Sequence, residues 1–220
     1  PGTTNDIVRP ILEKYSKRII GKSLGLVMNP EFLAEGTAVK DFMKPDRIVI
    51  GSIDKRSANV FSKVYTKFKN IDKLYTNLNT AEMIKYTANS YLALNISFAN
   101  EMANLSSKIK DVDIIDVLKG VYLDKRISPI INEKRISPDL TKFLFPGAGF
   151  GGSCFPKDLM AIKSFGESKY KKMSILNSVL KVNREQQDEI FEIIKKAVGN
   201  LKRKNICILG LAFKPNTDDI

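Results

Sequence analysis

Short apolar runs and longer stretches of helical periodicity alternate over the first third of the chain. The runs that predict strands are 24–28, 47–50 and 73–75. The stretches that predict helices, with apolar residues three or four positions apart, are 7–17, 32–43 and 55–68. Strands that alternate with helices are typical of a parallel α/β sheet, so we expect residues 1–77 to form part of a Rossmann-type domain.

The pattern changes after this region. Residues 79–108 contain neither Pro nor Gly and are rich in Ala, Leu, Met and Asn, which predicts one long helix. Further helices are predicted at 112–118, after Pro156 and at 172–198, while 120–145 is expected to be irregular and contains Lys-Arg-Ile-Ser-Pro twice. We therefore expect an all-helical domain at 78–200. A buried strand predicted at 205–209 would open a second α/β domain at 201–220, and both ends look like cuts through domains.

Composition narrows the class of protein. The chain has 220 residues, 43% of them hydrophobic, and a formal net charge of +12. Its basic residues are spread along the chain without a nucleic-acid-binding motif, so we expect a phosphorylated small molecule rather than DNA or RNA as partner. No apolar stretch reaches membrane-spanning length, and the two cysteines imply no disulfide framework, so a soluble cytoplasmic protein is expected. The absence of histidine excludes histidine-based metal sites, and no metal is expected.

One cysteine lies in the most informative segment, 145–158. Four glycines precede Cys154, and Pro156 suits a first helical turn, so the thiol is expected at a helix N-terminus, where the helix dipole favours a thiolate. The functional interpretation is a nucleophile, and the alternative is a structural cysteine in a tight turn. Asp158 either serves the same site or caps the helix. The glycines at 147, 149 and 152 fit G-x-G-x-x-G, but no strand precedes them, which argues against a dinucleotide fingerprint.

The long helix carries a second signal. Lys85 is the only basic residue between positions 74 and 107, and Asn89 lies one turn further along the same face. Lys85 is therefore either held at a site or paired with Glu82 in an ordinary surface ion pair. The amides of Asn95, Asn100 and Asn104 predict packing between helices.

A third cluster follows the first predicted strand. Glu31 and Glu35 lie in a segment that reads Asn-Pro-Glu-Phe-Leu-Ala-Glu-Gly. Loops at the carboxyl ends of parallel strands bind ligands in α/β sheets, which makes both carboxylates candidates for a site. The alternative is that they are helix-start carboxylates stabilised by the dipole.

Four ordered motifs together resemble the UDP-glucose dehydrogenase family of nucleotide-sugar 6-dehydrogenases. They are the segment 29–36, Lys85-x-x-x-Asn89, the segment 149–158 and Gly-Leu-Ala-Phe-Lys-Pro-Asn-Thr-Asp at 210–218. The resemblance implies the end of an NAD-binding Rossmann-type domain, a helical dimerisation domain with a long connecting helix, and the start of a UDP-binding domain. It also implies a homodimer or higher homo-oligomer formed through the central helices.

The resemblance implies oxidation of UDP-glucose to UDP-glucuronate with two NAD molecules. Cys154 would attack the aldehyde-level intermediate, and the resulting thiohemiacetal would lose a hydride to give a thioester that water hydrolyses. Lys85 and Asn89 would stabilise the oxyanion, Asp158 would organise Lys85 and water, and Glu31 would act in acid/base steps. GDP-mannose and UDP-N-acetylhexosamines are alternative substrates of the same chemistry.

The resemblance also assigns contacts. Substrate contacts are implied at Phe32, Leu33, Ala34, Glu35, Phe145, Gly149, Phe150, Gly151, Phe213 and Lys214. Contacts to NAD are implied at Glu35, Ser153, Cys154 and Lys157. A substrate-binding arginine is either Arg126 or Arg135, because the repeated pentapeptide makes the alignment ambiguous, and Arg126 is favoured. The family's G-x-G-x-x-G and early catalytic threonine do not occur in the chain, so we expect it to be inactive alone, and a non-catalytic dimerisation fragment is the rival interpretation.

Overall fold

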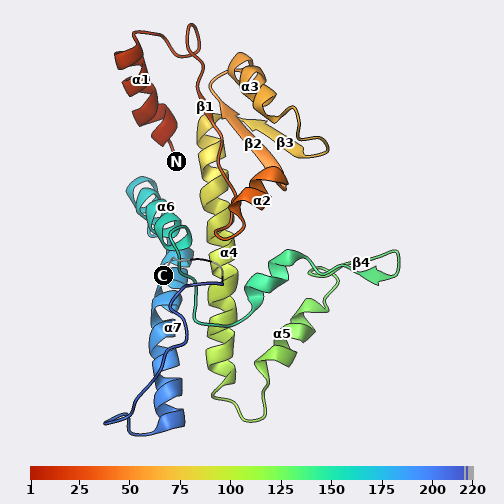
Figure 1. Cartoon of the computed structure of the whole chain (residues 1–220), viewed down its shortest axis with the longest axis vertical. Helices are drawn as coiled ribbons and strands as arrows, with labels where there is room; N and C mark the ends of the chain where they lie inside the picture. The colour runs from red at the N-terminus through yellow and green to blue at the C-terminus, as the bar shows by residue number, and fades with distance from the viewer. Residues whose placement is uncertain (216, 218–220) are drawn as a thin grey trace. The chain divides into compact units, whose positions relative to one another are not determined.

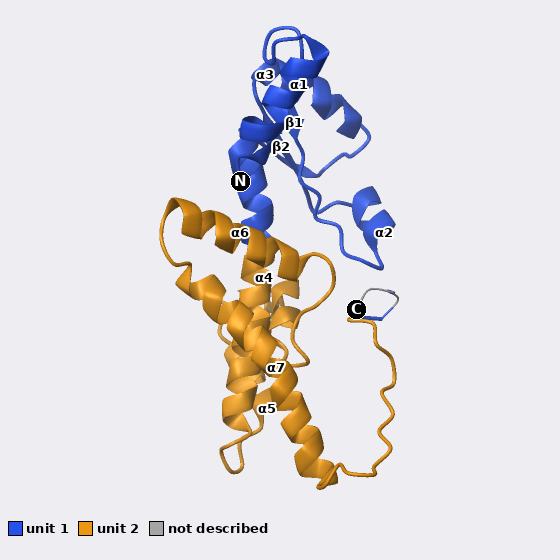
Figure 2. Ribbon diagram, turned by 90° about the vertical axis from the view of Figure 1, so that its left-hand side faces the viewer, with its two compact units in different colours: residues 1–88, 214–217 blue, residues 89–213, 218–220 orange. Residues whose placement is uncertain are grey.

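The computed structural model describes residues 1–215 and 217, which divide into two compact units. Unit 1 contains residues 1–88 together with 214, 215 and 217, and unit 2 contains residues 89–213 (Figure 2). The border falls inside the long helix α4 (Leu78–Ser106), which contributes residues to both units (Figure 1). This helix confirms the element predicted from the absence of Pro and Gly.

Unit 1 is built on a three-stranded sheet in the order β1-β2-β3. The strands are β1 (Val27–Met28), β2 (Arg47–Ser52) and β3 (Asp72–Thr76). β2 and β3 are parallel, as predicted, with Arg47 opposite Asp72, but β1 is antiparallel to β2, with Val27 opposite Ser52. The prediction of an all-parallel sheet is therefore wrong at β1. The last residue of β1 points towards the end of the sheet at which β2 begins, so the two strands run in opposite directions.

The helices of unit 1 are shorter than predicted. They are η1 (Thr3–Val8), α1 (Arg9–Ser16), α2 (Ala38–Met43), α3 (Lys55–Ser62) and η2 (Lys63–Tyr65). The helix predicted from residue 32 begins at Ala38, because the residues before it form a hydrogen-bonded loop. Side chains of β2, α3 and η2 form one hydrophobic core, made by Ile48, Ile50, Ala58 and Tyr65.

Unit 2 consists mainly of helices, as predicted. Its further elements are α5 (Ile114–Tyr122), β4 (Ile130–Ile131), β5 (Lys134–Arg135), η3 (Asp139–Leu144), α6 (Phe155–Lys169) and α7 (Ser174–Val198). The region expected to be irregular contains a β4–β5 hairpin, in which Ile130 pairs with Arg135. Asn132 and Glu133 at its tip both have positive φ, the geometry of a two-residue hairpin turn. The second copy of the repeated pentapeptide begins at β5.

The strand predicted at 205–209 is wrong. These residues form no regular element, and the predicted burial is also wrong, since Cys207 is exposed and Leu209 is 93% exposed. A strand needs hydrogen-bonded neighbours, and none pairs with this segment among the described residues. Positions 216 and 218 of the terminal motif lie outside the described residues. Within the described part of the chain, no helix is long and apolar enough to span a bilayer.

Candidate functional site

The loop after β1 is fixed at its first residue. Asn29 donates from Nδ2 to the Val49 carbonyl at 2.7 Å and accepts a hydrogen bond from the Tyr65 hydroxyl at 2.5 Å. Burial raises the pKa of Tyr65, which keeps the hydroxyl protonated and able to donate. Asn29 thus ties the loop to β2 on one side and to η2 on the other.

Glu31 and Lys85 form an ion pair in unit 1. The Lys85 Nζ lies 2.9 Å from the Glu31 Oε1, and the other carboxylate oxygen accepts the Leu33 N–H at 2.7 Å. The Lys85 side chain is 15% exposed and that of Glu31 is 53% exposed. The loop motif and the helix motif therefore meet in three dimensions, although their residues are 54 positions apart.

The alternative pairing of Lys85 with Glu82 is wrong. Glu82 is buried and accepts the backbone N–H groups of Thr3 and Thr4 at 3.1 and 2.7 Å. Burial would raise the pKa of Glu82, but the hydrogen bonds from Thr4 and Gly2 and the positive N-terminal amine together outweigh it, and the pKa is lowered. Because Glu82 is committed to the start of η1, Lys85 pairs with the loop instead.

The rest of the loop is held by Asp41 of α2. Its carboxylate accepts the Ala34 N–H at 3.0 Å and the Thr37 hydroxyl at 2.8 Å, and these bonds lower the pKa of Asp41. The Arg47 guanidinium stacks on the Phe32 ring at 3.8 Å from its centroid, a cation–π contact. These contacts fix the backbone from Phe32 to Thr37 in a single arrangement.

The helix-start alternative for Glu31 and Glu35 is also wrong. Both residues precede α2, whose first residue is Ala38, by more than two positions. The sequence argument placed this loop at the carboxyl ends of parallel strands, and this placement needs correction. Because β1 runs antiparallel to β2, the loop leaves the sheet at the end where β2 begins. The prediction that these carboxylates are functional therefore rests on the resemblance and on the Glu31–Lys85 pair.

In unit 2, Cys154 is the N-cap residue of α6, with Pro156 in the first turn, as the sequence predicted. Its side chain is half-buried, and its Sγ lies 3.8 Å from the Ser153 hydroxyl. Gly152, two residues earlier, has φ of +73°, and a Cβ added there would lie 2.9 Å from the Phe213 ring. The terminal motif thus brings Phe213 against the glycine loop, where only a glycine leaves room for it.

Asn89 and Asp158 form a buried pair in the same unit. The Asn89 Nδ2 donates to the Asp158 Oδ2 at 2.7 Å, and only 7% and 4% of the two residues is exposed. Lys157 donates to the other carboxylate oxygen at 2.8 Å. Asp158 also lies in the first turn of α6, as the capping interpretation expects, and its role in a site stays a prediction. The Asp158 backbone N–H donates to the Cys154 carbonyl at 2.9 Å, which couples the pair to the thiol-bearing residue.

Sequence reasoning missed the side chains that hold the glycine loop. Asn183 of α7 bonds both backbone groups of one residue: its Oδ1 accepts the Phe150 N–H at 2.7 Å and its Nδ2 donates to the Phe150 carbonyl at 2.9 Å. Asn100 accepts the Gly147 N–H at 2.7 Å, and Gln186 donates to the Gly147 carbonyl at 2.9 Å. Asn104 completes the group by donating to the Gln186 Oε1 at 2.9 Å.

A signal for these contacts exists in the sequence. The amides at 100 and 104 lie one turn apart in α4, and those at 183 and 186 lie one turn apart in α7. The asparagines of α4 were predicted to pack between helices, and Asn104 does so by bonding to α7. Asn95 instead bonds to the Tyr91 carbonyl of its own helix. The spacing of the amides in α7 indicates that they share a face, but it does not identify the glycine loop as their partner.

The two arginines of the repeated pentapeptide have different partners. Arg126 is paired bidentately with Asp124, and its side chain is 90% exposed. Arg135 donates from Nη1 to the carbonyls of Leu123 and Ser128, both at 2.8 Å. Arg135 therefore braces the end of α5 against the hairpin, whereas Arg126 presents its guanidinium to solvent.

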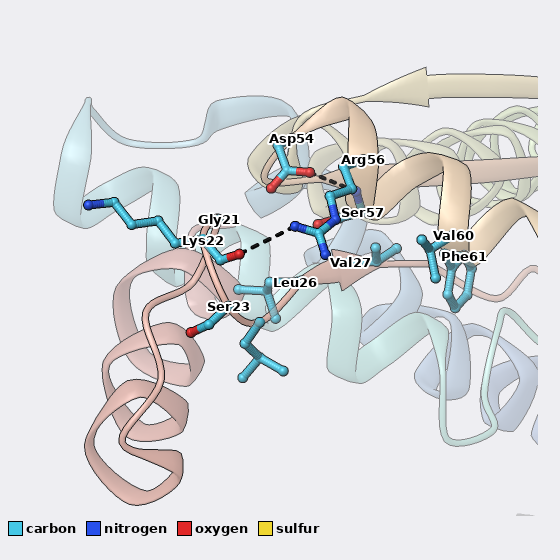
Figure 3. Close-up of a pocket in the computed structure, with 12 residues that line it drawn as sticks. Gly21, Lys22, Ser23, Leu26, Val27, Asp54, Arg56, Ser57, Val60 and Phe61 are labelled. Carbon is cyan, nitrogen blue, oxygen red and sulfur yellow. Dashed lines mark hydrogen bonds between the residues drawn. The ribbon is translucent and has the colours of Figure 1, made fainter.

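A pocket of about 540 Å³ lies elsewhere in unit 1 (Figure 3). It is lined by residues of 21–27, by Asp54 and by residues of α3. Asp54 accepts the Ser57 N–H at 2.6 Å, and Arg56 donates to the Lys22 carbonyl at 3.4 Å. None of the residues predicted for the site lines this pocket.

Comparison with known proteins identifies the family. Residues 79–185 match the model of the UDP-glucose/GDP-mannose dehydrogenase family, central domain, and residues 1–69 match the NAD binding domain of the same family. The two matches are adjacent, in the order that the resemblance predicted, and together cover most of the chain. The chain belongs to the UDP-glucose/GDP-mannose dehydrogenase family. The predicted fold class, a partial Rossmann-like domain followed by a helical central domain, is thereby confirmed.

Individual members of the UDP-glucose/GDP-mannose dehydrogenase family are similar over the whole chain. A protein of Rickettsia bellii named UDP-glucose 6-dehydrogenase is 43% identical, and one of Bacillus subtilis with the same activity in its name is 39% identical; each match covers 100% of this chain and 47% or 44% of the relative. A solved UDP-glucose dehydrogenase of Pyrobaculum islandicum matches with a TM-score of 0.86 and 41% identity, over 100% of this chain and 47% of that one. The chain thus spans about half the length of the curated relatives it matches.

Proposed function

We propose that the chain is part of an NAD-dependent UDP-glucose 6-dehydrogenase that oxidises UDP-glucose to UDP-glucuronate. The observation that carries the proposal is Cys154 at the N-terminus of α6, in a glycine loop and one turn from the buried Asn89–Asp158 pair. A half-buried thiol near amide donors and a carboxylate suits covalent catalysis at a carbonyl. The names of the relatives favour UDP-glucose as the substrate over GDP-mannose.

NAD would accept the two hydrides, and the residues of this chain would supply the nucleophile and part of the groups that act on the substrate. The Cys154 sulfur adds to the aldehyde carbon, which becomes a thiohemiacetal carbon; loss of a hydride gives the thioester, and water releases the carboxylate and the thiol. The Lys85 ammonium and the Asn89 amide stabilise the oxyanion at these stages. Glu31 serves as acid and base in the hydrolysis, and its ion pair with Lys85 places its carboxylate 2.9 Å from the ammonium.

The chain also carries groups suited to the phosphates of the substrate and of NAD. Ser153 and Lys157 flank Cys154 at the N-terminus of α6, where backbone N–H groups and the helix dipole favour phosphate. Glu35 is assigned to both ligands. We assign substrate contacts to the segments 32–35, 145 and 149–151, to Phe213 and Lys214, and to Arg126, whose exposed guanidinium suits a phosphate or a sugar hydroxyl.

Assembly and location are part of the proposal. A groove between α4 and α7 exposes apolar side chains such as Phe98 and Ile175, which are 47% and 65% exposed, and a second copy would cover them in a homodimer. Both cysteines are free thiols, which suits the reducing cytoplasm. Light scattering on the full-length protein tests the dimer, because a monomer at micromolar concentration would contradict it.

The decisive experiment uses the full-length protein with NAD and each nucleotide sugar in turn. We expect NADH formation with UDP-glucose at a rate at least ten times that with GDP-mannose or UDP-N-acetylglucosamine. A Cys154→Ser variant should fail to complete the oxidation to UDP-glucuronate, while Cys207→Ser, in an exposed segment, should behave like the parent. Equal turnover by Cys154→Ser would show that the nucleophile is assigned wrongly, and no NADH with UDP-glucose would refute the substrate.

A further inference from the structure

The glycine loop before Cys154 is gripped by neutral amides from two helices. Asn183 bonds both the N–H and the C=O of Phe150, and Asn100 and Gln186 bond the N–H and the C=O of Gly147. We call Asn100, Asn104, Asn183 and Gln186 the amide clamp. Asn100 is fully buried and Gln186 is 5% exposed, so water does not readily replace the hydrogen bonds that these two amides make, whereas Asn104 and Asn183 are half-buried.

We propose that the amide clamp, and Asn183 above all, is a positioning device that sets the reactivity of Cys154. The role deepens the proposed function and rests on it as far as turnover is concerned. Asn183 does not contact the thiol in the described residues; it acts through Phe150, whose backbone it holds at both ends.

The path from Asn183 to the cysteine is short and packed. The Phe150 ring is 9% exposed and meets the Phe155 ring edge-to-face, with centroids 6.0 Å apart. Phe155 is the residue after Cys154 and the first residue of α6. Both rings join a core with Ala93, Leu159 and Val179. The hydrogen bonds to the Phe150 backbone therefore fix the position of the Phe150 ring. This ring packs against Phe155 and so fixes the start of α6, where Cys154 lies.

The loop is shaped to accept Asn183. Gly149 has φ of +99°, and a Cβ added there would lie 2.5 Å from the Asn183 Oδ1. The glycine thus permits both the backbone conformation and the approach of the amide. By contrast, a Cβ added at Gly147 would meet nothing within 4 Å. The clamp amides are neutral and add no net charge near the thiol. They therefore fix the conformation of the glycine loop without adding a charge to the site.

The test is alkylation of Cys154 by iodoacetamide in the full-length protein, followed by mass spectrometry of its peptide. In Asn183→Asp a carboxylate oxygen replaces the Nδ2 donor and faces the Phe150 carbonyl, so the hydrogen bond from residue 183 to this carbonyl is lost. We expect the Cys154 alkylation rate to rise about tenfold and kcat with UDP-glucose to fall at least tenfold, with KM changed less than threefold. Cys207, exposed and remote in sequence, is the internal reference.

The matched control is Asn177→Asp. Asn177 also lies in α7 but bonds to Glu167 and to the Met173 carbonyl, not to the glycine loop, so its variant should keep parental alkylation and kcat. If Asn183→Asp does not fold, Asn183→Ser, which keeps a short polar side chain, replaces it. A Cys154 alkylation rate that stays unchanged or falls in a folded Asn183 variant overturns the proposal. Alkylation needs no turnover, so faster alkylation in a protein without activity on UDP-glucose would refute the proposed function and leave the positioning role standing.

Discussion

The two units hold their candidate residues by different means. In unit 1, Glu31 and Lys85 are held by a charged pair, with Asp41 and Arg47 fixing the same loop by further charged contacts. In unit 2, the loop that precedes Cys154 is held by the neutral amide clamp. The charged pair is partly exposed, whereas Asn100 and Gln186 of the clamp are buried and its other two residues are half-buried.

The difference follows from the cost of burial. An exposed ion pair gains only about 0–1 kcal/mol and stays adjustable, which suits groups that change protonation or partners during a reaction. A buried neutral amide that loses its partner leaves unsatisfied groups at about 1–3 kcal/mol each, which suits a rigid support. We infer that unit 2 holds the loop before Cys154 rigidly, whereas the Glu31–Lys85 pair of unit 1 stays adjustable.

The largest effect on stability is expected at Gly149. Gly149→Ala places a Cβ against Asn183 at a residue with φ of +99°. Left-handed backbone costs a non-glycine residue about 1–2 kcal/mol and overpacking adds about 1–3 kcal/mol, so we expect a loss of about 2–5 kcal/mol in the free energy of unfolding. Urea denaturation of the full-length protein measures it. Gly147→Ala, which meets nothing within 4 Å, is the control and should lose less than about 1 kcal/mol.

A smaller loss is expected when the buried pair of unit 2 is broken. Asn89→Ala removes the donor to the Asp158 Oδ2, a carboxylate in a residue only 4% exposed, and should cost about 1–3 kcal/mol. Asn95→Ala on the same helix removes only an amide bonded to the Tyr91 carbonyl at an exposed position and should be nearly neutral. Equal losses for the two variants would show that burial does not decide the strength of these amides.

The same contrast explains what the sequence could predict. Cys154 at a helix start and the long helix followed from local signals such as Pro156 and the lack of Pro or Gly after Asn79. The hydrogen bond between Asn89 and Asp158 was not predicted, because it joins residues 69 positions apart. Asn183 could not be predicted as a partner of Phe150, because their contact joins positions 33 apart and depends on how α7 packs. The direction of β1 also escaped prediction, since two residues carry no signal for parallel or antiparallel pairing.

The Glu31–Lys85 pair of unit 1 should contribute little to stability, and its contribution should fall as the salt concentration rises. In a double-mutant cycle with Lys85→Met and Glu31→Gln, we expect a coupling of about 0.5 kcal/mol at low salt that falls towards zero at about 0.5 M salt. The same salt change should leave the stability difference between Asn183→Ser and its parent unchanged, because that difference arises from neutral groups. A coupling above about 2 kcal/mol that persists in salt would show that the Glu31–Lys85 pair behaves as a buried ion pair. It would contradict the contrast between an adjustable charged pair in unit 1 and a rigid neutral clamp in unit 2.

The smallest effect concerns one titration. The Arg126 guanidinium and backbone N–H lower the pKa of Asp124 from 3.8 to about 2. A lowered folded-state pKa means that the stabilisation is present above about pH 3.8 and is lost as the pH falls towards 2. Arg126→Gln should return the carboxyl pKa, read by NMR, towards 3.8. Arg135→Gln, whose side chain bonds only to carbonyls, should leave it near 2, so the two copies of the pentapeptide would separate into a charged arm and a backbone brace.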